Sequence, residues 1–158
     1  MKATSLSDLK KKLGNLSGEE ILELCLHLAK YKKENKELLT YLLFDAQDER
    51  DYIKSIKAEM DKQFEEINKS TIYFGKKGIR KILRMTTKFI KYSGIKQTEI
   101  ELLIYFLKKM METGLPVQTN VTITNIYERV VLKIRKSLST LHEDLQYDYE
   151  QELNALNE

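Results

Sequence analysis

The stretch from residue 98 to residue 113 constrains the fold most, because it is apolar around most of its circumference when drawn as a helix. Thr98 and Glu101 fit a capping box at its start, and Gly114 and Pro116 follow its last turn. A helix with so little polar surface must be covered on several sides. The sequence therefore predicts a central buried helix, with other helices packed around it. Its apolar residues are Leu102, Leu103, Ile104, Tyr105, Phe106, Leu107, Met110 and Met111.

A basic amphipathic helix is predicted just upstream, from Ile79 to Tyr92, with residues 93–96 as the turn between the two helices. At about 100° per residue, the apolar side chains lie on one side of this helix and the cations on the other. No Asp or Glu occurs from Ile67 to Thr98. Because like charges at helical spacing repel, this face requires an anionic neighbour, either from the protein itself or from a partner. The cations that share the outer sector are Lys77, Lys81, Arg84, Lys88 and Lys91.

The rest of the chain also has helical periodicity, and its 158 residues include one Pro and six Gly. We predict an all-α fold of six or seven helices, packed as antiparallel helical hairpins in a bundle or a short helix-pair array. The length suits a single domain spanning residues 1–158, with about 143–158 as a frayed acidic end. The pattern over residues 124–156 fits either one helix or two, with a break around 137–140.

Some finer features can also be predicted. Residues 17–20 form a capping box, and residues 68–78 form a loop whose Ile72, Tyr73 and Phe74 pack against the core. Residues 143–152 are acidic and should fold back near the basic helix, since neither segment has local partners of opposite charge. Five apolar side chains should be almost fully buried: Leu24, Ile82, Phe89, Leu103 and Leu107.

Signals for catalysis or metal binding are poor. Glu23 and His27 are four residues apart, but a metal site needs more ligands than this pair. His142 stands beside two acids, and Cys25 lies on the apolar side of a helix, where a small buried hydrophobe is the usual interpretation. We predict no catalytic residue, no metal and no cofactor. The single cysteine and the lack of a signal peptide or membrane span predict a cytoplasmic protein.

The central region partly resembles two motifs that bind nucleotides or nucleic acids. Residues 75–78 contain two glycines and two lysines but lack the spacing and the strand–helix context of a phosphate-binding loop. Residues 80–113 have the outline of a helix-turn-helix, with Gly94 in the turn. The second helix would, however, direct Glu99 and Glu101 at the DNA, where base readout needs cationic or amide side chains. An ordinary helical hairpin is the better interpretation.

The chain resembles a family of small all-helical bacterial proteins that is catalogued only as a domain of unknown function. The similarity rests on Leu9 to Leu13, Leu16 to Ile21, Phe89 to Ile95 and the apolar helix from Ile100 to Met111. It covers most of the chain up to about Leu141, and its motifs are capped amphipathic helices and one Gly turn. The resemblance implies a helical, cytoplasmic bacterial protein. It implies no catalytic residues.

The function predicted from the sequence is that of a non-enzymatic helical scaffold or adaptor, which binds a partner through the basic face over residues 77–91. Sequence-independent binding to a nucleic-acid backbone is the alternative, because phosphates need cations on one exposed face. An enzyme with an unrecognised site has the lowest weight. The expected partner is an acidic protein surface or a nucleic-acid backbone, and no membrane.

Overall fold

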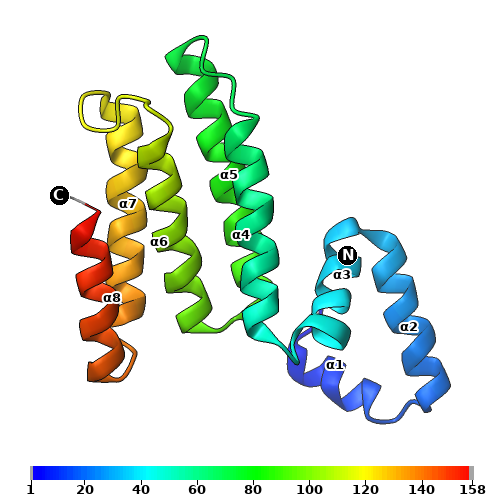
Figure 1. Cartoon of the computed structure of the whole chain (residues 1–158). Coiled ribbons are helices and arrows are strands. Elements are labelled where there is room, and N and C mark those ends of the chain that lie inside the picture. The colour runs from blue at the N-terminus through cyan, green and yellow to red at the C-terminus, as the bar shows by residue number, and fades with distance from the viewer. Residues whose placement is uncertain (1, 157–158) are drawn as a thin grey trace. The chain divides into compact units, whose positions relative to one another are not determined.

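The computed structural model describes residues 2–156, and within this range the chain is helical without strands (Figure 1). The all-α prediction is confirmed, but the described residues form eight α-helices and one short π-helical segment, whereas six or seven helices were expected. The additional helix arises because the apolar pattern over residues 124–156 forms two helices, the first of which ends at Leu138. None of the described helices combines the length and the apolar composition needed to cross a bilayer.

The contacts of the chain fall into two compact units, Met1–Phe44 and Asp45–Glu158. The single domain over residues 1–158 stays a prediction. In the first unit α2 packs on α3, and in the second α4 to α8 pack on one another. No run of Gly or Pro marks the junction. The boundary therefore lacks the signal that usually reveals a linker in a sequence.

The first unit contains α1 (Leu6–Leu13), α2 (Gly18–Tyr31), α3 (Lys33–Thr40) and a π-helical segment (Tyr41–Asp45) that runs past its end. The predicted capping box is confirmed: Ser17 Oγ accepts from the Glu20 amide at 3.2 Å, and the Glu20 carboxylate accepts from the Ser17 amide at 2.7 Å. No side chain of α1, α2 or α3 is buried. Leu24, expected in the core, is 43 % exposed, because α2 is covered mainly on the side that meets α3.

The second unit contains α4 (Glu49–Glu65), α5 (Ile72–Ser93), α6 (Lys96–Glu112), α7 (Val121–Leu138) and α8 (Glu143–Ala155). Helix α6 packs against all four of the others, so the predicted central helix is confirmed. Leu103 and Leu107 are fully buried and Ile82 almost so. Phe89 is only half-buried, because it lies at the edge of the buried side of α5, with its ring centroid 5.9 Å from that of Tyr92.

Helix α6 begins two residues earlier than the sequence predicts, so the expected capping box at Thr98 does not form. Ile95 is the N-cap residue, and Thr98 is buried inside the first turn. The Thr98 hydroxyl donates to Glu49 Oε1 at 2.6 Å. The threonine therefore ties α6 to the start of α4, and its hydroxyl is not used to cap its own helix.

Helix α5 begins at Ile72, so most of the predicted loop 68–78 is helical. Thr71 caps it by accepting from the Phe74 amide at 3.3 Å. Ile72, Tyr73 and Phe74 are exposed and do not pack in the core. Gly75 is buried in the first turns of α5, and a Cβ there would lie 2.7 Å from Leu115 Cδ2, so a larger residue would force the Leu115 side chain to shift.

The C-terminal pattern forms two helices, α7 and α8, separated by residues 139–142. The acidic end is helical through Ala155 and is not frayed over its described part. It packs against α6 and α7, and Glu150 pairs with Arg135 of α7 at 3.4 Å. The expectation that this end folds back on the basic helix is therefore wrong. The apolar stripe of α8, which includes the buried Leu153, determines where it packs.

The turn between α5 and α6 depends on Gly94, which has φ 68° and donates its amide to the Ile90 carbonyl. A side chain in this left-handed conformation is disfavoured, so Gly94→Ala should lower the free energy of unfolding by about 1–2 kcal/mol. Urea unfolding followed by circular dichroism measures this loss. Gly94→Asn is the control, because Asn tolerates this conformation better and should lose less. Equal stability of wild type and Gly94→Ala would contradict the turn geometry.

Candidate partner-binding site on α5

Helix α5 has its buried residues on one side and its cations on the other. Its buried residues recur every three or four positions and are Gly75, Ile79, Ile82, Thr86 and Ile90. They face α4 and α6, which both pack on α5. Because α5 starts at Ile72, the cations that precede Ile79 belong to the same helix and continue the same exposed face.

The structure places the five predicted site residues on the outside of α5. Lys77, Lys81, Arg84 and Lys91 are exposed, and Lys88 is half-buried. Four of the five line an open hollow of about 850 Å³ along the helix. Lys81 instead lines a smaller hollow of about 220 Å³ that it shares with Lys77.

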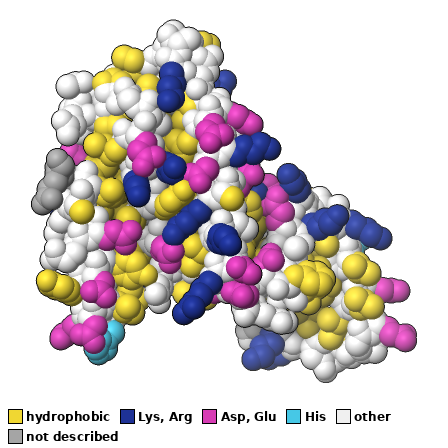
Figure 2. Space-filling model, viewed as in Figure 1, with side chains coloured by type: hydrophobic (Ala, Val, Ile, Leu, Met, Phe, Trp, Pro, Cys, Tyr) yellow, Lys and Arg dark blue, Asp and Glu magenta, His cyan; other side chains and the backbone are white. Residues whose placement is uncertain are grey.

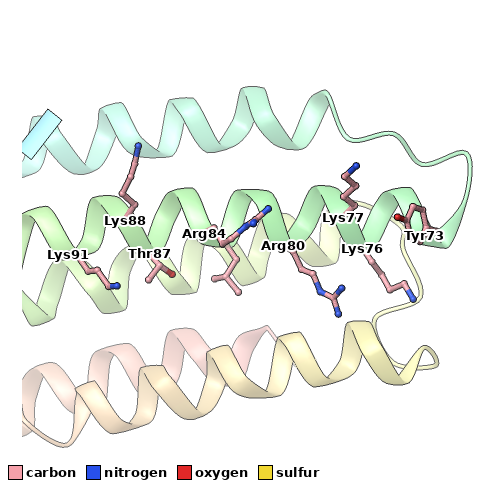
Figure 3. A pocket seen from close by; sticks show the side chains of 9 residues that line it. Tyr73, Lys76, Lys77, Arg80, Arg84, Thr87, Lys88 and Lys91 are labelled. Carbon is pink, nitrogen blue, oxygen red and sulfur yellow. The ribbon is translucent and has the colours of Figure 1, made fainter. Parts of the chain in front are cut away.

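The same hollow includes residues that the sequence-based site left out. Lys76 and Arg80 add two cations to it, and Tyr73, Leu83 and Thr87 supply a less polar surface. Figure 3 shows these side chains along α5, with Lys77 and Lys88 directed to one side of the helix and Lys76 and Arg80 to the other. The signal for the two missed cations was present in the charge run. They were omitted because both lie outside the narrow sector of the helix that the five predicted cations share.

Most cations of this face form no ion pair with a carboxylate of the described residues, although Glu66 lines the smaller hollow together with Lys77 and Lys81. Within the described residues 2–156, no carboxylate forms an ion pair with Lys76, Lys77, Arg80, Arg84 or Lys91. Lys81 also has no such pair there. The Lys88 ammonium lies over the Phe89 ring at 4.7 Å and the Tyr92 ring at 5.9 Å, which holds this cation against α5.

Several carboxylates of this unit pair with cations outside α5. Asp61 of α4 accepts from the Tyr105 hydroxyl at 2.7 Å and pairs with Lys109 at 3.1 Å. Burial alone would raise the pKa of Asp61, but these two partners bring it below its ordinary value. On the face shown in Figure 2, cations and carboxylates alternate over α4, α6 and α7. The uninterrupted basic run of α5 differs from that pattern.

A buried carboxylate occupies the start of α6. Glu99 is 6 % exposed and interacts with Lys96 at 2.9 Å, Lys133 at 3.0 Å and Ser137 at 2.8 Å. Burial acts to raise its pKa, but the hydrogen bonds from these three partners lower it overall. Since Thr98, Glu99 and Ile100 are all buried, the first turn of α6 is not available to a DNA groove.

The histidines and the cysteine do not combine with acids into a site. Within the described residues, no three His, Cys, Asp or Glu side chains are placed to hold a metal ion. Cys25 is half-buried between α2 and α3. Residues 75–78 lie inside α5 and so form no phosphate-binding loop.

Comparisons with family models, with curated proteins and with solved structures found no match to this chain. The resemblance to the helical family of unknown function therefore stays a prediction.

Proposed function

We propose that this protein is a non-enzymatic helical adaptor that binds an acidic protein segment through the basic face of α5. The observation behind the proposal is a row of five cations, Lys76, Lys77, Arg80, Arg84 and Lys91, that line a hollow on one helix face and form no ion pair with a carboxylate of the described residues. An all-basic face is unfavourable by itself, because neighbouring like charges repel. Carboxylates of a partner would remove that repulsion and would associate rapidly with the face.

The less polar part of the hollow favours a protein over a nucleic acid. Leu83 is half-buried among the cations, and Tyr73 lies at one end of the row, 66 % exposed. A partner segment that carries apolar side chains between its carboxylates would cover Leu83 as well as the charges. Single-stranded nucleic acid would need several aromatic rings for stacking, and this hollow has Tyr73 alone. We further propose a cytoplasmic location, in line with the single cysteine.

Poly-L-glutamate is a defined probe for this face. At low salt, replacing Lys77, Arg84 and Lys91 by Glu should lower the affinity at least about tenfold, since each exposed ion pair is worth about 0.5–1 kcal/mol. The measurement is a fluorescence titration of the full chain with the labelled polymer. These three side chains are exposed, so the variant should keep the helical circular dichroism of the wild type.

The matched control reverses three exposed lysines outside α5: Lys54, Lys108 and Lys136. It changes the net charge by the same amount but leaves the α5 face intact. The proposal requires the control to bind nearly as tightly as the wild type. Equal losses in both variants would mean that only net charge matters, and the α5 site would then be rejected.

Binding to a nucleic-acid backbone is the second candidate function, and the spacing of the cations favours it. Lys77 to Lys91 span about 21 Å at 1.5 Å per residue, which is enough to meet several phosphates. If all five predicted cations contacted duplex DNA, log affinity would fall against log salt with a slope of about −4.5. The same titration with single- and double-stranded oligonucleotides measures this slope. Tighter binding of DNA than of poly-L-glutamate at matched charge would favour the nucleic-acid function.

A further inference from the structure

The exposed side of α8 carries a row of carboxylates. Asp144, Asp148 and Glu152 are four residues apart, so they follow one side of the helix, and all three are exposed. Within residues 2–156, Asp148 and Glu152 form no ion pair, and the ion pair of Asp144 is with His142 at 3.5 Å. No Lys or Arg occurs from residue 137 to residue 158. Because like charges at this spacing repel, the acidic row requires an opposite charge, as the basic face of α5 does.

The fold keeps these two surfaces of one chain apart. In the second unit α8 lies beside α7, and α5 lies on the other side of α6 (Figure 1). The side of α8 that contains the buried Leu153 packs on α6 and α7, and the acidic row faces away from them. The acidic row and the basic face can therefore meet only between two copies of the chain.

The cations of α5 include a row that matches the acidic row of α8. Lys76, Arg80 and Arg84 are also four residues apart, and each lines the hollow without an ion pair to a described carboxylate. At 1.5 Å per residue, each of the two rows spans about 12 Å. Side chains four residues apart form the ridges that interdigitate when two helices cross at about −50°. The two rows therefore have the length and the spacing to lie side by side.

The apolar side chains beside the two rows select the direction of pairing. Tyr147 of α8 is 67 % exposed and adjoins the acidic row, and Leu83 of α5 is half-buried in the hollow beside the basic row. Seen from outside, with each helix running upward from its N-terminus, both side chains lie to the left of their row. Two helices placed face to face bring these sides together only when they are antiparallel. Tyr147 then covers Leu83 while the charges of the two rows meet.

We propose that the acidic row of α8 binds antiparallel along the basic row of α5 in a second copy of this chain. Asp148 lies opposite Arg80 of the second copy. Asp144 lies opposite Arg84 of the second copy. The inference rests on the function proposed for α5 and names the acidic partner segment. Because the contact joins two different faces, the end chains of an assembly each keep a free face, so the protein assembles head to tail.

Sedimentation velocity of the full chain at low salt tests the proposal. The wild type should form species larger than one chain as its concentration rises, and added salt should dissociate them. The variants Arg80→Glu/Arg84→Glu and Asp148→Lys/Glu152→Lys each reverse one face, and each should raise the dissociation constant at least about tenfold. All four side chains are exposed, so both variants should keep the helical circular dichroism of the wild type. A wild type that stays monomeric would overturn the proposal.

An equimolar mixture of the two variants is the stricter test. In the α5 variant both rows are acidic, and in the α8 variant both rows are basic, so neither variant can pair with itself. Each can still pair with the other through an acidic row and a basic row. The mixture should therefore restore the assembly that each variant alone has lost. A mixture no more associated than its components would rule out pairing between α5 and α8.

The matched control is Glu19→Lys/Glu23→Lys on α2, which reverses two exposed acids with the same spacing. It changes the net charge as much as the α8 variant does, and it should assemble like the wild type. Equal losses in the control and the α8 variant would reject α8 as the contact. The poly-L-glutamate titration separates this inference from the function of α5. If the wild type binds the polymer but stays monomeric, only the self-association is wrong; if it does not bind the polymer, both proposals are wrong.

Discussion

Leu103→Ala should lower the free energy of unfolding of the second unit by about 2–5 kcal/mol, because it opens a cavity where the chain is most tightly packed. Leu103 is 0 % exposed and lies on α6, the helix that α4, α5, α7 and α8 all contact. The surrounding helices cannot all move inward at once to fill the space. Urea unfolding followed by circular dichroism gives the loss.

The control for this substitution is Leu132→Ala on α7, whose side chain is 65 % exposed. It removes the same atoms from a surface position, so its effect should stay within about 0.5 kcal/mol. A loss below about 1 kcal/mol for Leu103→Ala, or equal losses for the two leucines, would contradict the position of α6 at the centre of the unit.

Replacing Glu99 by Ala should cost about 1–3 kcal/mol, because the buried Ser137 hydroxyl and the Lys133 ammonium would both lose their acceptor. The matched control is Glu101→Ala on the same helix. Glu101 pairs with Lys57 at 2.6 Å, but both side chains are about a third exposed, so its loss should be about 1 kcal/mol or less. Equal losses of unfolding free energy at the two positions would show that the burial of Glu99 adds nothing to the stability.

The stabilisation that Glu99 contributes should also depend on pH, and it should decrease on acidification. The folded-state pKa of Glu99 lies below its ordinary value, so the unfolded chain binds the proton more tightly. The stabilisation is complete above the unfolded pKa of about 4.3 and is lost as the pH falls through the lower folded pKa. The stability difference between wild type and Glu99→Ala should therefore be constant from about pH 7 to 5 and shrink below about pH 4. A difference that grows on acidification would contradict the ion-pair network.

Periodicity was enough to predict the all-helical class and the central position of α6. Leu103 and Leu107 belong to a pattern that is apolar all round, and the structure buries both of them completely. Leu24 belongs to a similar pattern and is exposed, because its unit provides too few helices to cover it. Periodicity shows which side chains favour burial, whereas burial itself depends on which elements are near enough to supply the cover.

The predicted starts of α5 and α6 are wrong because residues that suggest a local turn or cap make contacts with distant parts of the chain instead. Thr98 and Glu101 have the residue types and the spacing of a capping box, but Thr98 bonds to Glu49 and Glu101 pairs with Lys57, which are both on α4. In α5, glycine at position 75 is a residue type typical of loops, but Gly75 is helical and lies against the Leu115 side chain. Both partners are distant in the sequence, so neither contact can be inferred from local spacing.

Binding through α5 is tested most directly by residue-resolved NMR. The amide spectrum of the isotopically labelled chain is recorded at low salt while poly-L-glutamate is added. The largest shift changes should fall on α5 between Tyr73 and Lys91, and they should be lost when Lys77, Arg84 and Lys91 are replaced by Glu. The lysines at residues 10–12 of α1 provide an internal comparison, because they form a second cluster of exposed cations on a helix. Shift changes spread evenly over both lysine clusters, or centred on residues 10–12, would contradict the assignment of α5 as the binding face.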